Sequence, residues 1–66
     1  MREYEIDEYI IRQAYAGLNR YIVYDVYKDG KLLKTCWGFG ELAKFLGMDW
    51  HALNRRMMEI DELEYS

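Results

Sequence analysis

The sequence predicts one α+β domain: an N-terminal helix over residues 6–18, a two-stranded antiparallel β-hairpin over 20–37, a helix-turn-helix-like pair over 40–58, and an acidic tail or helix extension over 59–66. Three observations predict it. Apolar residues recur at helical spacing near the N-terminus, an Asp-Gly dipeptide separates two apolar runs, and a glycine separates two short helical segments. The 66 residues are 52% hydrophobic and include seven tyrosines. That composition suits one compact core and excludes a disordered chain.

The N-terminal helix is predicted from apolar residues spaced three and four apart, which would share one helix face. These residues are Ile6, Tyr9, Ile10, Ala14 and Leu18. Asp7 and Glu8 lie near the predicted start, where the helix dipole favours negative charge. Gly17 and Asn19 then end the helix. A strand is the alternative for YEIDEYII (4–11), because its apolar residues also fall on alternate positions.

The hairpin is predicted from YIVYDVY and LLKTCW, which flank Asp29-Gly30. This dipeptide accepts the two positive φ values of a type I′ turn. A regular ladder then pairs Asp25 with Lys34 across the strands. The face expected to point inward carries Ile22, Tyr24, Val26, Leu33 and Trp37. The other face carries Tyr21, Val23, Tyr27, Leu32 and Cys36, and it is apolar enough to need partial cover by the N-terminal helix or by a partner chain.

The C-terminal helices are predicted from the stretch that follows the hairpin. Residues 41–46 read as a short helix, and Gly47 turns the chain. Asp49 stands where an N-cap residue is expected, before a second helix over 50–58. Apolar residues continue at helical spacing beyond residue 58, which predicts that this helix extends towards Glu64.

Residues 39–58 meet the requirements of a helix-turn-helix unit. Such a unit needs a small residue inside its first helix and a glycine in its turn, and Ala43 and Gly47 supply them. The apolar places are filled by Leu42, Leu46, Met48 and Leu53. The LAKFLGMD core resembles the helix-turn-helix family. One departure is Arg56, where that family has an aliphatic residue, and a rotated or extended second helix would put Met57 in its place.

With the hairpin in front, residues 21–58 resemble two groups of proteins. One group is the modular DNA-binding repeats of homing endonucleases. The other is a set of very short proteins encoded by phages of Gram-positive bacteria. The resemblance implies that the exposed side of the second helix faces the DNA major groove, where Asn binds adenine and Arg binds guanine. The implied DNA-binding residues are Trp50, His51, Asn54, Arg55 and Arg56, with Lys28, Lys31, Lys34 and Lys44 as contacts to phosphates.

Charge is distributed unevenly along the chain, whose formal net charge is −3. Residues 20–58 hold seven Lys and Arg against four Asp and Glu, whereas residues 59–66 hold four acids and no cation. Local charge steers a nearby anion, because salt screens charges beyond about 8 Å. The basic middle therefore permits DNA binding.

The alternatives are an adaptor or inhibitor that binds a host or phage protein through the acidic ends and aromatic hairpin, and an assembly fragment whose helix pair only packs the core. The thin core and the second apolar face also suggest a homodimer.

Several functional classes receive no support from the sequence. One Cys and one His cannot form a four-ligand zinc site or an intrachain disulfide. No nucleophile lies beside a base, and no glycine-rich phosphate loop is present, so we expect neither an enzyme nor a cofactor. The acidic N-terminus is no signal peptide, and no run of about 18 apolar residues could span a membrane. A cytoplasmic location is expected.

Overall fold

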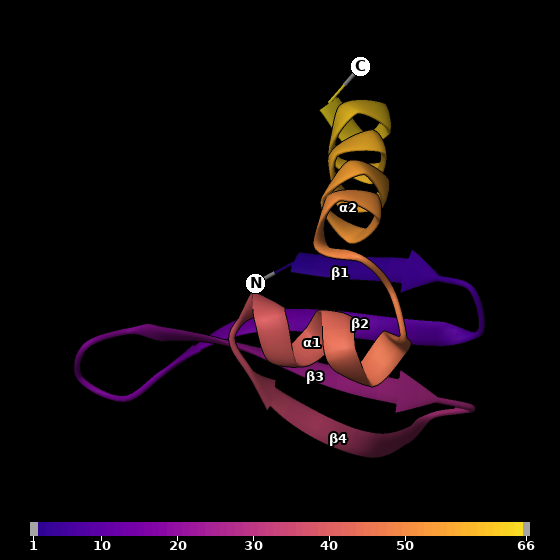
Figure 1. Ribbon diagram of the computed structural model, residues 1–66. Coiled ribbons are helices and arrows are strands. Elements are labelled where there is room, and N and C mark those ends of the chain that lie inside the picture. Colours follow the sequence, from indigo (N-terminus) through magenta and orange to yellow (C-terminus); the bar gives the residue numbers. More distant parts are fainter. Residues whose placement is uncertain (1, 66) are drawn as a thin grey trace.

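The computed structural model describes residues 2–65, with side chains through residue 63. Four strands precede two helices: β1 Arg2–Ile6, β2 Tyr9–Ala16, β3 Tyr21–Lys28, β4 Lys31–Trp37, α1 Phe39–Leu46 and α2 Trp50–Tyr65. The strands form one antiparallel sheet in the order β1-β2-β3-β4 (Figure 1). The α+β class is thus confirmed, but the predicted N-terminal helix and two-stranded sheet are wrong, because residues 2–16 add two strands to the hairpin.

The segment predicted as a helix forms the β1–β2 hairpin. In β1, buried Tyr4 and Ile6 alternate with exposed Glu3 and Glu5, which is the period of a strand with one face covered. Ile6 pairs with Tyr9 across a two-residue turn. Ile and Tyr fit a half-buried pleated surface better than a helix. The residues expected to end the helix lie in the β2–β3 loop instead, where Gly17 accepts a backbone hydrogen bond from Arg20 at 3.2 Å.

The β3–β4 hairpin has the predicted turn. Asp29 and Gly30 have φ values of 54° and 78°, as a type I′ turn requires. The first two pairs of the ladder also match the prediction, with Lys28 opposite Lys31 and Tyr27 opposite Leu32.

Beyond those pairs, a β-bulge at Leu33 shifts the register by one residue, so Val26 faces Lys34 and Asp25 faces Thr35. The predicted Asp25–Lys34 pair is therefore wrong. Because successive side chains of a strand alternate between faces, the shift exchanges the two faces of β4 from that point on. Cys36 is fully buried, whereas Trp37 is 60% exposed and Leu33 is exposed. The prediction that Leu33 and Trp37 point inward is wrong for the same reason.

The core lies between one face of the sheet and the two helices. Its buried members are Tyr4, Ile6, Ile11, Tyr24, Val26, Cys36, Leu42, Ala43, Leu53 and Met57. Each large aliphatic side chain in this group contributes about 1.5–3 kcal/mol through burial. Aromatic rings pack in pairs at the edges of this core. The ring centroids of Tyr24 and Phe39 are 6.3 Å apart, and those of Tyr9 and Phe45 are 6.1 Å apart.

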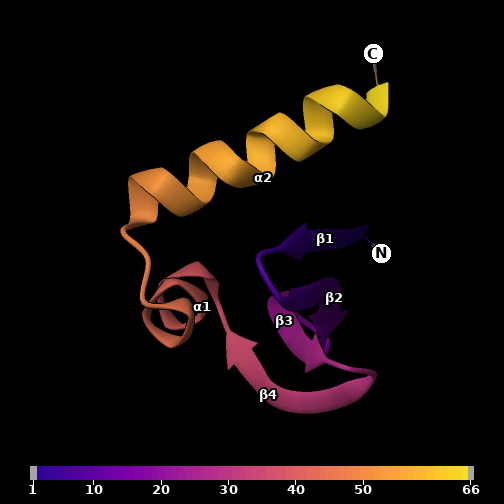
Figure 2. The ribbon, with the colours of Figure 1, turned by 90° about the vertical axis from the view of Figure 1, so that its right-hand side faces the viewer.

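The two helices leave one face of the sheet bare. In Figures 1 and 2, α1 lies against one face and α2 passes over the β1 edge, where Arg2 and Asp61 form an ion pair at 2.6 Å. No helix of the described chain lies against the opposite face, which we call the open face. Because strand residues alternate, the register assigns to it Glu3, Glu5, Ile10, Arg12, Ala14, Ala16, Tyr21, Val23, Asp25, Tyr27, Leu32, Thr35 and Trp37.

Candidate functional site

The joint between α1 and α2 is fixed by backbone hydrogen bonds. Gly47 has a φ of 68°, in the left-handed region that glycine occupies without strain. Its N–H donates to the Lys44 carbonyl at 3.2 Å, and the Met48 N–H donates to the Ala43 carbonyl at 3.0 Å. This pattern is a Schellman motif, which satisfies the last carbonyls of α1 and turns the chain sharply. Gly47 is thus the turn residue, as predicted.

The start of α2 is held by Asp49. Its Oδ2 accepts a hydrogen bond from the His51 N–H at 3.0 Å, and its carbonyl accepts one from the Leu53 N–H at 2.9 Å. These are the bonds of an N-cap residue, which satisfies backbone N–H groups that the first turn of a helix leaves without partners. The predicted N-cap is confirmed.

The inward side of α2 is set by Leu53 and Met57, which are 0% and 7% exposed. Met57 occupies the buried place at which the helix-turn-helix pattern would put residue 56. Arg56 lies beside it and is half-buried, with Nη1 3.7 Å from Asp7 Oδ1 in the β1–β2 turn. It therefore faces the sheet rather than the exposed side of α2.

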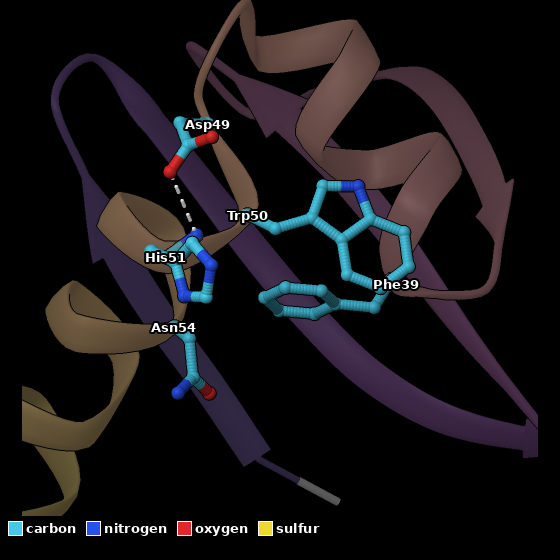
Figure 3. A pocket seen from close by; sticks show the side chains of 5 residues that line it. All are labelled: Phe39, Asp49, Trp50, His51 and Asn54. Carbon is cyan, nitrogen blue, oxygen red and sulfur yellow. Dashed lines mark hydrogen bonds between the residues drawn. The ribbon is translucent and has the colours of Figure 1, made fainter.

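Trp50 packs back onto the first turn of α1. Its ring meets that of Phe39 edge-on, with centroids 5.7 Å apart, and it covers Gly40. Together with Asp49, His51 and Asn54, these rings line a shallow open hollow (Figure 3). Trp50 is still 59% exposed, so one side of the indole borders the hollow and remains accessible.

The exposed side of α2 carries three of the predicted contact residues, His51, Asn54 and Arg55. The Asn54 side-chain amide lies 3.5 Å from the Met58 sulfur, a weak acceptor that leaves the amide available to a ligand. Within the described side chains, Arg55 forms no ion pair, and neither do exposed Lys44 on α1 and Lys31 at the start of β4.

The other predicted cations are engaged by acids. Lys28 Nζ lies 3.1 Å from Glu8, and Lys34 Nζ lies 3.5 Å from Glu41. The hydrogen bond to Glu8, followed by its charge, raises the pKa of Lys28. Because these pairs are exposed, they contribute little stability, but they lower the positive charge available to an anionic ligand. The structure therefore divides the predicted cations into Lys31, Lys44 and Arg55, which form no ion pair among the described residues, and Lys28, Lys34 and Arg56, which are neutralised by acids.

One feature that the sequence did not predict is a polar row across the open face. Cross-strand pairing aligns Glu3, Arg12, Asp25 and Thr35 on β1 to β4. Arg12 Nε lies 3.2 Å from Glu3 Oε1, and the Thr35 hydroxyl donates to Asp25 Oδ1 at 2.6 Å. Arg12 also lies over the Tyr27 ring, 5.8 Å from its centroid. The row depends on β1 and on the bulge, so no local sequence signal indicates it.

Reactive side chains are sparse in the described part of the chain. Cys36 is buried, and burial, followed by the charge of Glu41, raises the pKa of its thiol. Among residues 2–63 no three His, Cys, Asp or Glu side chains group as metal ligands would, and no described helix is long and apolar enough to cross a bilayer.

Comparison of the chain with protein-family models, curated protein sequences and solved structures finds no match.

Proposed function

We propose that this chain is a small DNA-binding module of phage or mobile-element type, acting in the cytoplasm and engaging DNA through the first two turns of α2. The observation that carries the proposal is the placement of His51, Asn54 and Arg55 on the exposed side of α2, opposite Leu53 and Met57. Asn and Arg are the side chains that bind adenine and guanine through two hydrogen bonds in the major groove. The resemblance of LAKFLGMD to helix-turn-helix sequences supports the same assignment.

The distribution of charge favours DNA that approaches α2 from the side on which α1 lies. Lys44 lies on the last turn of α1, which residues 47–49 connect directly to the start of α2. On the later turns of α2, Glu59 and Glu62 are exposed and would repel phosphates. With so few available cations, one copy of the chain should bind DNA weakly, and the affinity should fall steeply as salt concentration rises.

Fluorescence anisotropy with a labelled duplex pool of mixed sequence, measured over a salt titration, tests the proposal. Arg55→Gln is expected to weaken binding at least about fivefold if Arg55 contacts a base, because such a contact contributes about 1–3 kcal/mol. Arg20→Gln is the matched control, since Arg20 is an exposed arginine without an ion pair in the described chain and lies in the β2–β3 loop. Absence of binding in low salt, or equal effects of the two substitutions, would contradict the proposal.

A second candidate function is binding of a host or phage protein, in the manner of an adaptor or inhibitor. The observation that favours it is the open face, on which Tyr21, Leu32 and Trp37 are more than half exposed. Aromatic residues of this kind are enriched at protein interfaces. A stoichiometric partner that is captured from lysate after nuclease treatment, and is lost with Trp37→Ser but not with Arg55→Gln, would favour this function over DNA binding.

A further inference from the structure

The open face is a surface of the sheet against which no described helix packs (Figure 2), and Val23 is its one residue that is nevertheless buried, at 6% exposed. Ile10, Tyr21, Leu32 and Trp37 are 37%, 57%, 53% and 60% exposed on it. The register places Ile10 and Leu32 on one side of the charged row and Tyr21 and Trp37 on the other, and exposed apolar residues gathered on one face can mark an interaction site. The charged residues that cross this face, Glu3, Arg12 and Asp25, indicate what kind of partner would bind it.

The row contains one carboxylate, that of Asp25, which has no cation as a partner among the described side chains. Arg12 and Asp25 are direct neighbours across β2 and β3, yet Arg12 forms its ion pair with Glu3. Asp25 is half-buried and accepts a hydrogen bond from Thr35, but within the described chain it forms no ion pair. A partner that places a cation above Asp25 and an anion above Arg12 would satisfy both residues.

A second copy of the chain meets that requirement. We propose that the open faces of two copies pack against each other around a two-fold axis that runs parallel to the strands, between β2 and β3. Each β2 residue then lies opposite the β3 residue of the same cross-strand pair in the second copy. Arg12 therefore lies opposite Asp25 of the second copy, and the contact occurs twice. The alternative axis, along the row, would place Arg12 against Arg12.

The side chains in the cross-strand rows next to the charged row have sizes that also suit this two-fold axis. Small residues of β2 lie opposite larger residues of β3, and the packing of two sheet faces requires such interdigitation. The alanine pairs are Ala14 with Val23 and Ala16 with Tyr21, whereas Ile10 lies opposite Tyr27 as a contact between two large apolar side chains. The result is a two-layer sandwich of the aligned class, with the sheets about 10 Å apart.

The area of the open face determines how strongly two copies are expected to associate. Strands of five to eight residues, spaced about 4.8 Å apart with a rise of about 3.3 Å per residue, give a flat area of about 440 Å² per copy. Two such faces total about 880 Å², which is below the about 1,200–2,000 Å² that standard specific interfaces bury and corresponds to a weak contact. The dimer should therefore be reversible, forming as the protein concentration rises through the micromolar range. This inference stands independently of DNA binding by α2.

Analytical ultracentrifugation of Arg12→Asp and Asp25→Arg variants, alone and mixed, tests the arrangement. Each variant alone brings like charges together twice, so its self-association should weaken at least about tenfold relative to wild type. An equimolar mixture should form a heterodimer, because both contacts then join Asp to Arg. An effect confined to one chain could not be rescued by mixing. Arg55→Asp, a charge reversal on α2, is the control and should dimerise normally.

Ile10→Lys provides a test that does not disturb the charged row. Its cross-strand neighbour in β1 is Glu5, so the new lysine is tolerated within one chain. In the dimer the same lysine would be buried against Tyr27 of the second copy, so it should abolish association, while thermal unfolding measured at a dilution where wild type is monomeric stays unchanged. A wild-type chain that remains monomeric at high micromolar concentration, or a folded Arg12→Asp and Asp25→Arg mixture that fails to associate, would overturn the proposal.

Discussion

Gly40 and Trp50 are in close contact, since a Cβ placed on Gly40 would lie 2.7 Å from Cζ2 of the Trp50 indole. The first turn of α1 therefore contacts the first turn of α2 through a position that has no side chain. Any larger residue at position 40 must displace the ring from its place beside Phe39.

Gly40→Ala should move the indole with little change in stability. Alanine is favoured over glycine inside a helix by about 1 kcal/mol, and this gain offsets the loss of ring packing. The measurable result is a red shift and altered quenching of Trp50 fluorescence, recorded in a Trp37→Phe background. Gly40→Ser should act in the same direction. An unchanged emission spectrum would contradict the close contact.

Gly47→Ala should destabilise the fold by about 1–2 kcal/mol, because a side chain in the left-handed region meets the following carbonyl. An added Cβ would have no other neighbour within 4 Å, so backbone strain is the only expected effect. Gly47→Asn is the control and should lose less, since Asn adopts this conformation more readily. Chemical denaturation measures both variants, and equal stability of Gly47→Ala and wild type would contradict the prediction.

Deletion of Leu33 should change stability by only about 1 kcal/mol or less, because it removes the extra residue of the bulge and leaves Cys36 opposite Tyr24 and Thr35 opposite Asp25 in a regular ladder. Leu33→Ala retains the bulge and changes an exposed side chain, so its effect should be small. Deletion of Leu18, which is fully exposed in the β2–β3 loop, is the length-matched control. Thermal unfolding followed by circular dichroism distinguishes these cases. A Leu33 deletion several kcal/mol less stable than the Leu18 deletion would contradict the assigned register, since a ladder without the bulge would have Cys36 and Trp37 exchanged between faces by the deletion.

Cys36 should react with a thiol reagent only when the fold opens. The side chain is fully buried, and its raised pKa reduces the reactive thiolate at neutral pH. We expect labelling of the native protein to be at least about a hundredfold slower than labelling in denaturant. A Leu33→Cys substitution in a Cys36→Ala background provides an exposed comparison and should react rapidly. Comparable rates at the two positions would disprove burial of Cys36.

Alkaline pH should destabilise the fold through its buried tyrosines. Burial, the largest cause for each, raises the pKa of Tyr4 and Tyr24 above 10.0. The unfolded chain then releases the phenol protons at lower pH than the folded chain, so stability falls as pH rises above about 10, by up to about 1.4 kcal/mol per pH unit for each proton.

Denaturant unfolding across the alkaline range measures the slope. Lys28 acts in the same direction, because its pKa is raised by Glu8 and its favourable charge is lost as pH rises through the raised value. Tyr24→Phe therefore isolates one phenol and should unfold with a shallower dependence on pH than wild type. Identical slopes for Tyr24→Phe and wild type would contradict the assignment.

Features controlled by adjacent residues could be predicted from the sequence. The type I′ turn at Asp29-Gly30, the turn at Gly47 and the cap at Asp49 each depend on one or two side chains and their own backbone. The N-terminal segment could not be settled in this way, because its apolar residues satisfy helical and strand spacing at once. Only pairing with β3 and burial against α2 decide it, and both involve residues distant in sequence.

The same distinction between features set by adjacent residues and features set by distant residues applies to the candidate functional sites. The exposed side of α2 could be predicted, since helical spacing fixes which residues lie opposite Leu53. The neutralisation of Lys28 and Arg56 could not be, because their acidic partners lie in a β1–β2 turn that was expected to be helical. The row of Glu3, Arg12 and Asp25 was missed for the same reason.

The order β1-β2-β3-β4 also has a consequence for folding speed. Each strand pairs with the next one along the chain, so every step of sheet formation closes only a short loop, and such hairpins form in about 1–10 µs. Docking of α2 on β1 is different, because the contact between Arg2 and Asp61 joins opposite ends of the described chain. We therefore expect the sheet to assemble early, and release of α2 from β1 to be the first event of unfolding.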